Sequence, residues 1–302
     1  MKTAVLPTLL TASEWRSRAE LHLQRAERWT LPCRERRTRG VPHPIDDFLF
    51  TYYSYSFAKL EFWHPPLGEV LELAGDMPER FLRSPYRSEK GAVYQNLEAL
   101  GSKELRRLIW IRSLLAATHG RAPNFACHGL HEWAMVYRGK DVRHEKTTPL
   151  RLSQTEIDAV VESRPVICSH FDAFRFFAPE AVSLNRLQPA FADRPAFEQP
   201  GCIHANMDLY KWASKAMPWI GSELLLDCFE QAVQLRDLDM RASPYDLRAW
   251  GREPVRIETA EGRRAYEMEQ RELAEKSQRL RAKLIAALDF VEPSIQTMAS
   301  SD

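Results

Sequence analysis

The stretch SELLLDCFEQAVQLRDLDMR, residues 222–241, decides the fold class. Ser222 can cap a helix, and apolar residues recur at the spacing of one helical face: Leu225, Phe229, Ala232, Val233, Leu235 and Leu238. A helix with so wide an apolar face has to pack against other elements to keep that face from water. We therefore expect this segment to lie inside a helical core.

Helical signals recur along the rest of the chain. Thr11 and Glu14 form a predicted capping box, as do Ser153 and Glu156. Further helices are expected over 102–119, 202–217 and 259–288, whereas 67–101 carries turn residues typical of irregular structure with a short hairpin. The predicted fold is mainly α, a single compact helical domain with a few short strands or irregular segments.

The predicted organisation has three parts. Residues 1–40 form a capped N-terminal helix and a basic linker, 41–290 form a helical core domain, and 291–302 form a frayed tail.

Bulk composition narrows the possible partners. The chain has 302 residues and a formal net charge of +1, so any binding to nucleic acid depends on a local patch. The sequence has no run of about 18 apolar residues, so no membrane span is predicted, and no convincing signal peptide is visible. The five cysteines include no Cys-x-x-Cys pair. The expected location is the cytoplasm, with no membrane partner.

Four segments place histidine beside acid in an apolar setting. They are His43-Pro-Ile-Asp46-Asp47, His128-x-x-His131-Glu132, His170-Phe-Asp172 and His204-x-x-x-Asp208. Helical spacing predicts one face for His43 with Asp47, for His204 with Asp208, and for His128, His131 and Glu132. Because buried polar groups need partners, we expect the segments to share a polar pocket.

Two chemistries suit such a pocket. The histidines His43, His128, His131, His170 and His204 are ligands for iron, zinc or manganese if several segments meet in a helical core. Alternatively, Asp47, Glu132, Asp172 and Asp208 are acid–base groups tuned by burial. A third interpretation is a non-enzymatic helical protein whose His–acid pairs only stabilise its core.

Two neighbouring patterns add candidates for substrate binding. Residues 48–63, FLFTYYSYSFAKLEFW, offer Tyr52, Tyr53 and Tyr55 as a platform for a planar ligand, with core packing as the alternative. Arg241, near Asp237 and Asp239, is a candidate for orienting substrate. Three cysteines, Cys127, Cys168 and Cys202, each precede a candidate histidine by one or two residues. They are interpreted as metal ligands, as nucleophiles or as small buried side chains.

Five blocks together resemble bacterial proteins labelled 3-methyladenine DNA glycosylase: HPIDDFLFTYYSY, GLHEWAMVYR, CSHFDAFRFF, QPGCIHANMDLYKWA and DLDMRASPYDL. The resemblance covers most of the chain, from His43 to the final helix. It implies a DNA-repair hydrolase that cleaves the N-glycosidic bond of a damaged nucleobase. It also implies DNA or a nucleobase-containing ligand as partner, a carboxylate among Asp46, Asp47, Glu132, Asp172 and Asp208 as the catalytic group, and the tyrosines as stacking residues.

Overall fold

The structure is a computed structural model that describes residues 8–139 and 148–291. The predicted frayed tail lies outside the described residues, apart from Val291. The α-helices are α1 (Ala12–Arg39), α2 (Phe48–Tyr52), α3 (Phe57–Glu61), α4 (Ser102–His119), α5 (Leu130–Met135), α6 (Gln154–Glu162), α7 (Phe171–Phe174), α8 (Arg194–Phe197), α9 (Ile203–Lys215), α10 (Ser222–Arg241) and α11 (Ala260–Ala287). The strands are β1 (Thr8–Leu10), β2 (Glu69–Glu72), β3 (Tyr86–Glu89) and β4 (Ala92–Gln95).

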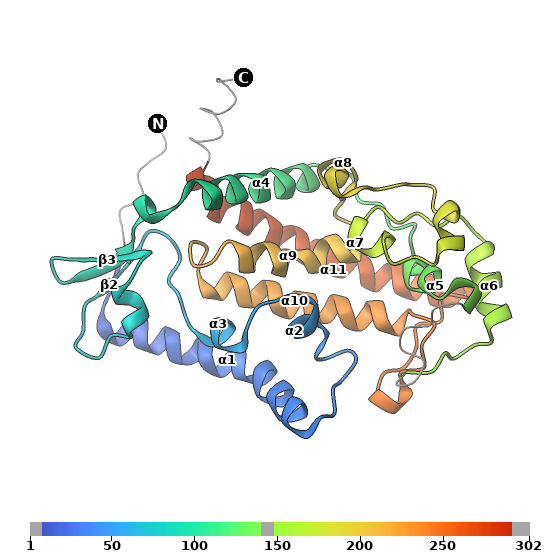
Figure 1. Ribbon diagram of the computed structural model, residues 1–302, viewed down its shortest axis with the longest axis horizontal. Coiled ribbons are helices and arrows are strands. Elements are labelled where there is room, and N and C mark those ends of the chain that lie inside the picture. Colours follow the sequence, from blue (N-terminus) through green and yellow to red (C-terminus); the bar gives the residue numbers. More distant parts are fainter. Residues whose placement is uncertain (1–7, 140–147, 292–302) are drawn as a thin grey trace, which may run out of the picture.

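The expected mainly α fold is confirmed, and α9 and α10 form its centre (Figure 1). α10 packs against both α9 and α11, and α11 also packs against α4. Leu225, Phe229 and Leu238 of α10 are fully buried or nearly so, as the apolar periodicity predicted. α9 is buried on almost all sides and carries polar residues inward, including Asp208. These two helices therefore bring polar side chains into the core.

α1 begins and ends where local signals place it. The Thr11 hydroxyl accepts a hydrogen bond from the Glu14 amide, while the Glu14 carboxylate accepts one from the Thr11 amide. Gly40 ends the helix in the left-handed conformation, with a φ of 68°. The capping box at Ser153 and Glu156 is likewise formed at the start of α6. Both predicted capping boxes are confirmed.

A small sheet covers one end of the molecule, next to the start of α1 (Figure 1). Its strand order is β1-β2-β4-β3, with β1 parallel to β2 and the other pairs antiparallel. Beneath it lies a separate apolar cluster that includes Trp15, Leu71 and Val93. The expected short hairpin is β3–β4, and the rest of the segment 67–101 consists of strand β2, short 3₁₀ helices and turns.

The opposite end carries the shorter helices α5, α6 and α7 (Figure 1). Polar side chains from these short helices, such as His131 of α5 and His170 at the start of α7, contact α10 and α9. Among the described residues, no helix is both long enough and apolar enough to span a membrane.

Candidate functional site

Three of the four predicted His–acid segments converge where the start of α9 meets the end of α10. His131 and Glu132 come from α5, His170 and Asp172 from the start of α7, and His204 and Asp208 from α9. The rings of His131 and His204 lie 4.5 Å apart between centroids, and those of His204 and His170 lie 5.6 Å apart. His204 therefore connects two groups of polar side chains.

The first group, here called the Asp239 cluster, consists of His131, Glu132, His204, Arg236 and Asp239. His131 Nε2 lies 2.7 Å from Asp239 Oδ1, and His204 Nε2 lies 3.9 Å from Asp239 Oδ2. Arg236 Nη1 donates to Asp239 Oδ2 at 2.9 Å and to Glu132 Oε1 at 3.3 Å. Asp239 is fully buried, so these partners replace the water that its carboxylate loses.

The second group, here called the Asp208 cluster, contains Tyr53, His170, Asp172, Arg194, Glu198, Asp208 and Lys211. Lys211 Nζ lies 2.9 Å from Asp172 Oδ2 and 3.0 Å from Asp208 Oδ2. Arg194 also donates to Asp172, and its Nη1 lies 3.4 Å from Asp208 Oδ2. Two fixed cations thus bridge the two aspartates.

Tyr53 and Glu198 complete the Asp208 cluster. The Tyr53 hydroxyl donates to Asp208 Oδ1 at 2.9 Å, and Glu198 Oε1 accepts from Arg194 Nη1 at 3.1 Å. His170 Nε2 lies 3.4 Å from Asp208 Oδ2, although neither ring nitrogen of this buried histidine forms a hydrogen bond. Every charged group of the cluster is therefore within reach of an opposite charge.

The protonation states of the Asp239 cluster follow from burial and charge. Burial raises the pKa of Glu132, and the negative charge of Asp239 adds to the effect. Burial also lowers the pKa of His204 to about 3, so its imidazole is neutral. For His131, burial works against the charged form, but the carboxylate of Asp239 outweighs it and raises the pKa well above the ordinary value. Glu132 thus keeps its proton to higher pH than an ordinary glutamate, and His131 keeps its charge to higher pH than an ordinary histidine.

The Asp208 cluster holds its aspartates in the ionised form. Burial opposes ionisation of Asp172, but the hydrogen bond from Arg194 and the charge of Lys211 outweigh it and lower the pKa. The pKa of Asp208 is also lowered, because His170 and Lys211 together outweigh the opposing effect of burial.

A cavity of about 240 Å³ joins the two clusters, and we call it the aromatic pocket. Its polar lining comes from both clusters: Glu132, His204 and Arg236 from the first, and Tyr53 and Asp172 from the second. The rest of the lining is mostly aromatic and sulfur-containing, from Phe48, Tyr52, Met135, Val136, Ala173, Phe176, Met207, Met240 and Tyr245. An apolar cavity with a few converging polar groups is the usual form of a small-molecule site.

The structure does not place His128 with His131 and Glu132, so the predicted shared helix face is wrong. α5 begins only at Leu130, because Gly129 has a φ of 76° and His128 a φ of 46°. This left-handed turn directs His128 outward, where its Nε2 lies 3.4 Å from Glu267. The helical spacing applies from Leu130 onward and not before.

The predicted His43–Asp47 helix face is also wrong, since α2 begins at Phe48. Asp47 instead accepts hydrogen bonds from the His43 amide and from the Arg36 guanidinium. His43 and Asp47 line a second cavity of about 510 Å³ that shares Phe48 and Tyr52 with the aromatic pocket. They belong to neither cluster.

Tyr52 and Tyr53 line the aromatic pocket, as the sequence suggested, but Tyr55 does not. The Tyr55 ring packs edge-on against Tyr210 instead. Arg241 lies outside the site as well, since its Nη1 is 3.1 Å from Asp237 and 2.9 Å from Glu269.

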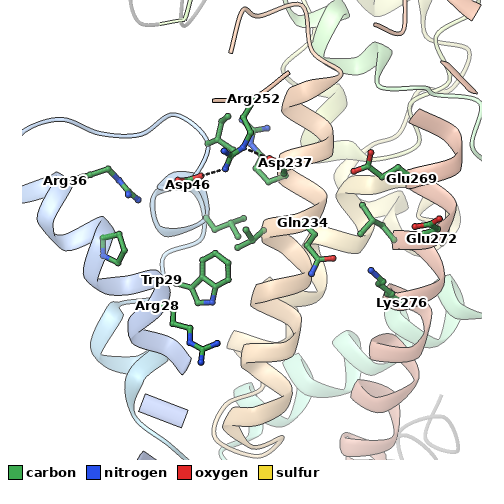
Figure 2. Close-up of a pocket in the computed structure, with 16 residues that line it drawn as sticks. Arg28, Trp29, Arg36, Asp46, Gln234, Asp237, Arg252, Glu269, Glu272 and Lys276 are labelled. Atoms are coloured by element: carbon green, nitrogen blue, oxygen red, sulfur yellow. Dashed lines mark hydrogen bonds and ion pairs between the residues drawn. The ribbon is translucent and has the colours of Figure 1, made fainter. Parts of the chain in front are cut away.

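A separate groove of about 510 Å³ lies between α1, α10 and α11, and Figure 2 shows its lining. Arg252 bridges Asp46 and Asp237 at one end, while Trp29 and Gln234 face the middle (Figure 2). This groove is larger than the aromatic pocket, but no histidine lines it. We therefore place the candidate site at the aromatic pocket.

Metal binding by either cluster has to compete with the protein's own cations. His131, Glu132, His204 and Asp239 offer ligand atoms within 4.8 Å of one another, and so do His170, Asp172 and Asp208. Such donors suit iron, zinc or manganese. However, Arg236 already bonds Asp239 and Glu132, and Lys211 already bonds Asp172 and Asp208.

Several site residues were not expected from the sequence. Lys211 had a usable signal, because a lysine three residues after Asp208 on a helix buried nearly all round needs a partner. Arg236 had one as well, at the i−3 position to Asp239 on the buried face of α10. Arg194 and Glu198 come from a Pro-rich segment with no local pattern that points inward.

No protein-family model matches the chain, and comparison with curated proteins and with solved structures also gave no match. The class of protein is therefore defined by the fold and the site alone: a mainly α protein with two His–carboxylate clusters beside an aromatic pocket.

Proposed function

We propose that this protein is a hydrolase that cleaves the N-glycosidic bond of a nucleobase-containing ligand bound in the aromatic pocket. One observation carries the proposal: Glu132 and Asp172 line the same pocket, and their pKa values are moved in opposite directions. In glycoside hydrolysis two carboxyl groups have different pKa values: the one with the higher pKa acts as the general acid, and the other stays ionised. The resemblance to DNA glycosylases points to the same reaction.

The pocket's walls suit a planar ring. Phe48 and Tyr52 stack on each other, with ring centroids 5.1 Å apart and an interplanar angle of 12°, and both side chains line the pocket. Stacking on aromatic side chains contributes about 1–3 kcal/mol per base. A cavity of about 240 Å³ admits a single base rather than a larger ring assembly.

The two carboxyl groups then divide the chemistry. As the carbon–nitrogen bond breaks, the protonated Glu132 gives its proton to the leaving base, which departs neutral. The positive charge that develops on the sugar is stabilised by the ionised Asp172. A water oxygen bonds to the anomeric carbon, and its proton passes to the Glu132 carboxylate, which restores the starting state.

Arg236 contributes by holding Glu132 in place. Its guanidinium bonds Glu132 Oε1 and Asp239 Oδ2, and its centre lies 3.9 Å from the centroid of the Phe48 ring. One side chain thus positions the proposed acid and one aromatic wall. Because its charge is taken up by these partners, Arg236 is a poor ligand for a phosphate group.

Release of free base, measured by chromatography, tests the proposal. The substrates are purine and pyrimidine nucleosides and alkylated single- and double-stranded oligonucleotides. Comparing the two kinds shows whether the enzyme acts on small molecules or on DNA. Glu132→Gln and Asp172→Asn should each lower kcat by about 10²-fold or more, the usual contribution of such groups. Tyr55→Phe is the matched control, because this side chain lies outside the pocket. No base released from any substrate, or unchanged turnover in both variants, contradicts the proposal.

We place second a metal-dependent enzyme that acts on a small molecule with iron, zinc or manganese. The observation in its favour is the close approach of His131, Glu132, His204 and Asp239. It ranks second because Arg236 already contacts Glu132 Oε1 and Asp239 Oδ2, two of the atoms that would bind the metal. Elemental analysis of protein purified without a chelating tag tests it: one metal ion per chain supports this alternative, and a content far below one contradicts it.

A further inference from the structure

Cys127, His131 and Asp239 form a continuous series of thiol, imidazole and carboxylate. Cys127 Sγ lies 3.3 Å from His131 Nδ1, and the other ring nitrogen, Nε2, lies 2.7 Å from Asp239 Oδ1. A nucleophile bonded to a base, with a third group orienting that base, is the arrangement that activates cysteine in enzymes. Cys127 has no role in the hydrolase proposed above, in which Asp239 acts only through its charge beside Glu132 and its contact with Arg236.

The local chain conformation creates the series. The left-handed residues His128 and Gly129 turn the chain, and the Leu130 amide donates to the Cys127 carbonyl at 2.9 Å. This turn places Cys127 against the ring of His131, four residues later. Positive φ is uncommon for a residue other than glycine and indicates a constraint when it occurs.

His131 is the group that can activate Cys127. His131 is a buried histidine whose Nε2 is held 2.7 Å from the Asp239 carboxylate, so its other ring nitrogen, Nδ1, is the one that meets the Cys127 sulfur. A charged imidazole next to a cysteine stabilises its thiolate, which is the reactive form. Cys127 is half-buried, whereas Cys168 is buried.

A small cavity of about 10 Å³ adjoins this series, and its walls contain polar atoms without partners. Cys127, His131, Tyr266 and Gln270 are among its lining residues. The Tyr266 hydroxyl and Gln270 Oε1 are buried and have no hydrogen-bond partner, although Gln270 Nε2 donates to the Gly201 carbonyl at 2.8 Å. A polar cavity of this size holds one molecule about as large as water.

Two other cysteines line the same cavity but are not activated. Burial raises the pKa of Cys202 to about 12 and that of Cys168 well above its ordinary value. Both sulfurs therefore stay protonated at neutral pH and serve as internal references for Cys127.

We propose that Cys127 is a nucleophilic cysteine, activated by His131 and Asp239, that reduces a hydroperoxide as small as hydrogen peroxide. The thiolate sulfur attacks one peroxide oxygen, the oxygen–oxygen bond breaks, and sulfur is oxidised to a sulfenic acid. The leaving hydroxide takes the proton of the His131 imidazolium and becomes water. Peroxide, thiolate and imidazolium thus yield sulfenic acid, water and neutral imidazole.

Site-resolved mass spectrometry of the full chain tests the proposal. At pH 6.5 an ordinary thiol is about 1% ionised, so Cys127 should react with iodoacetamide about tenfold faster than cysteine in an unstructured peptide, after allowing for the lower nucleophilicity of a stabilised thiolate. Cys202 should react far more slowly than the peptide. With hydrogen peroxide and dimedone, a probe for sulfenic acids, adducts should form at Cys127.

Variants separate activation from simple exposure. Cys127→Ser should abolish the adduct, and Asp239→Asn, checked for folding by circular dichroism, should lower the Cys127 rate toward that of the peptide. The wild-type comparison with the peptide decides the question even if Asp239→Asn does not fold. A Cys127 rate equal to or below that of the peptide, or dimedone adducts formed equally at Cys202, would overturn the proposal.

Discussion

The Asp239 cluster and the Asp208 cluster contain the same kinds of residue but hold their protons differently. In the Asp239 cluster one fixed cation, Arg236, serves two carboxyl groups, and the pKa of Glu132 is raised. In the Asp208 cluster Arg194 and Lys211 both reach Asp172 and Asp208, and the pKa of each aspartate is lowered. Burial disfavours ionisation in both places, so the positive charge that reaches each carboxyl group, from arginine, lysine or a charged histidine, decides which of them is ionised.

Glu198 is the carboxyl group of the Asp208 cluster whose pKa is raised rather than lowered, and its surroundings agree with this explanation. Burial raises the pKa of Glu198, which bonds Arg194 but not Lys211. Glu198 and Glu132 each reach one fixed cation, and both have raised pKa values, whereas Asp172 reaches two and has a lowered one. Asp239 also reaches only Arg236, but its pKa is lowered because the charge of His131 is added to that of the arginine.

The largest expected effect is on stability when a cation is removed from each cluster. Arg194→Met should lower the free energy of unfolding by about 3–5 kcal/mol, because it leaves buried carboxylates without their partner. Arg236→Met should cost only about 1–2 kcal/mol, since Asp239 keeps its hydrogen bond to His131 and the pKa of Glu132 is already raised by burial. Urea unfolding at neutral pH measures both, and equal losses would contradict the contrast between the clusters.

A smaller effect should appear in the pH dependence of stability. The pKa of Glu132 is raised in the folded state, so its contribution to stability is full below the unfolded value and is lost as pH rises through the folded value. Glu132→Gln should therefore flatten the decline in stability above pH 5, by at most about 1.4 kcal/mol per pH unit.

Asp172→Asn is the matched control for that measurement. The pKa of Asp172 is lowered, so its contribution is present above the unfolded value and is lost only as pH falls through the folded value. This variant should change the curve below about pH 4 and leave the slope between pH 5 and 8 as in the wild type. A change in that upper range would show that Asp172 is not ionised there.

The proposed hydrolysis should respond to the two clusters on opposite limbs of its pH profile. Lys211→Met removes a charge that lowers the pKa of Asp172, so the acid limb should move to higher pH by about one unit. Arg236→Met removes a charge that lowers the pKa of Glu132, so the alkaline limb should move to higher pH. Steady-state rates from pH 4 to 9 measure both, and a shift of the same limb in both variants would contradict the assigned roles.

The smallest effect concerns single hydroxyl groups. Tyr53→Phe removes the hydrogen bond to Asp208 and should cost about 1 kcal/mol of stability. Tyr55→Phe should change stability by no more than the experimental error, because its hydroxyl makes only a 3.5 Å hydrogen bond to the Lys59 carbonyl near the surface. Thermal unfolding of the two variants side by side gives the difference, and equal melting temperatures would remove Tyr53 from the Asp208 cluster.

Sequence reasoning placed His131, Glu132, His170 and His204 near one another, and the structure brings them together. It was wrong about the His128 face, where a left-handed turn precedes the helix. Nor could it show that Arg241 pairs with Asp237 and Glu269 at the periphery, because the choice between Asp237 and Asp239 depends on which face of α10 meets α11.

The sequence by itself determined the features that depend on residues at most four apart. The capping boxes at Thr11 and Ser153 and the apolar face of α10 follow from local hydrogen bonding and helical periodicity. Only the tertiary structure decided the charges of the site. The partner of His131 is Asp239, 108 positions away, and the partner of Tyr53 is Asp208, 155 positions away. Which carboxyl group receives a cation depends on the packing of α5, α9 and α10, and no local pattern encodes it.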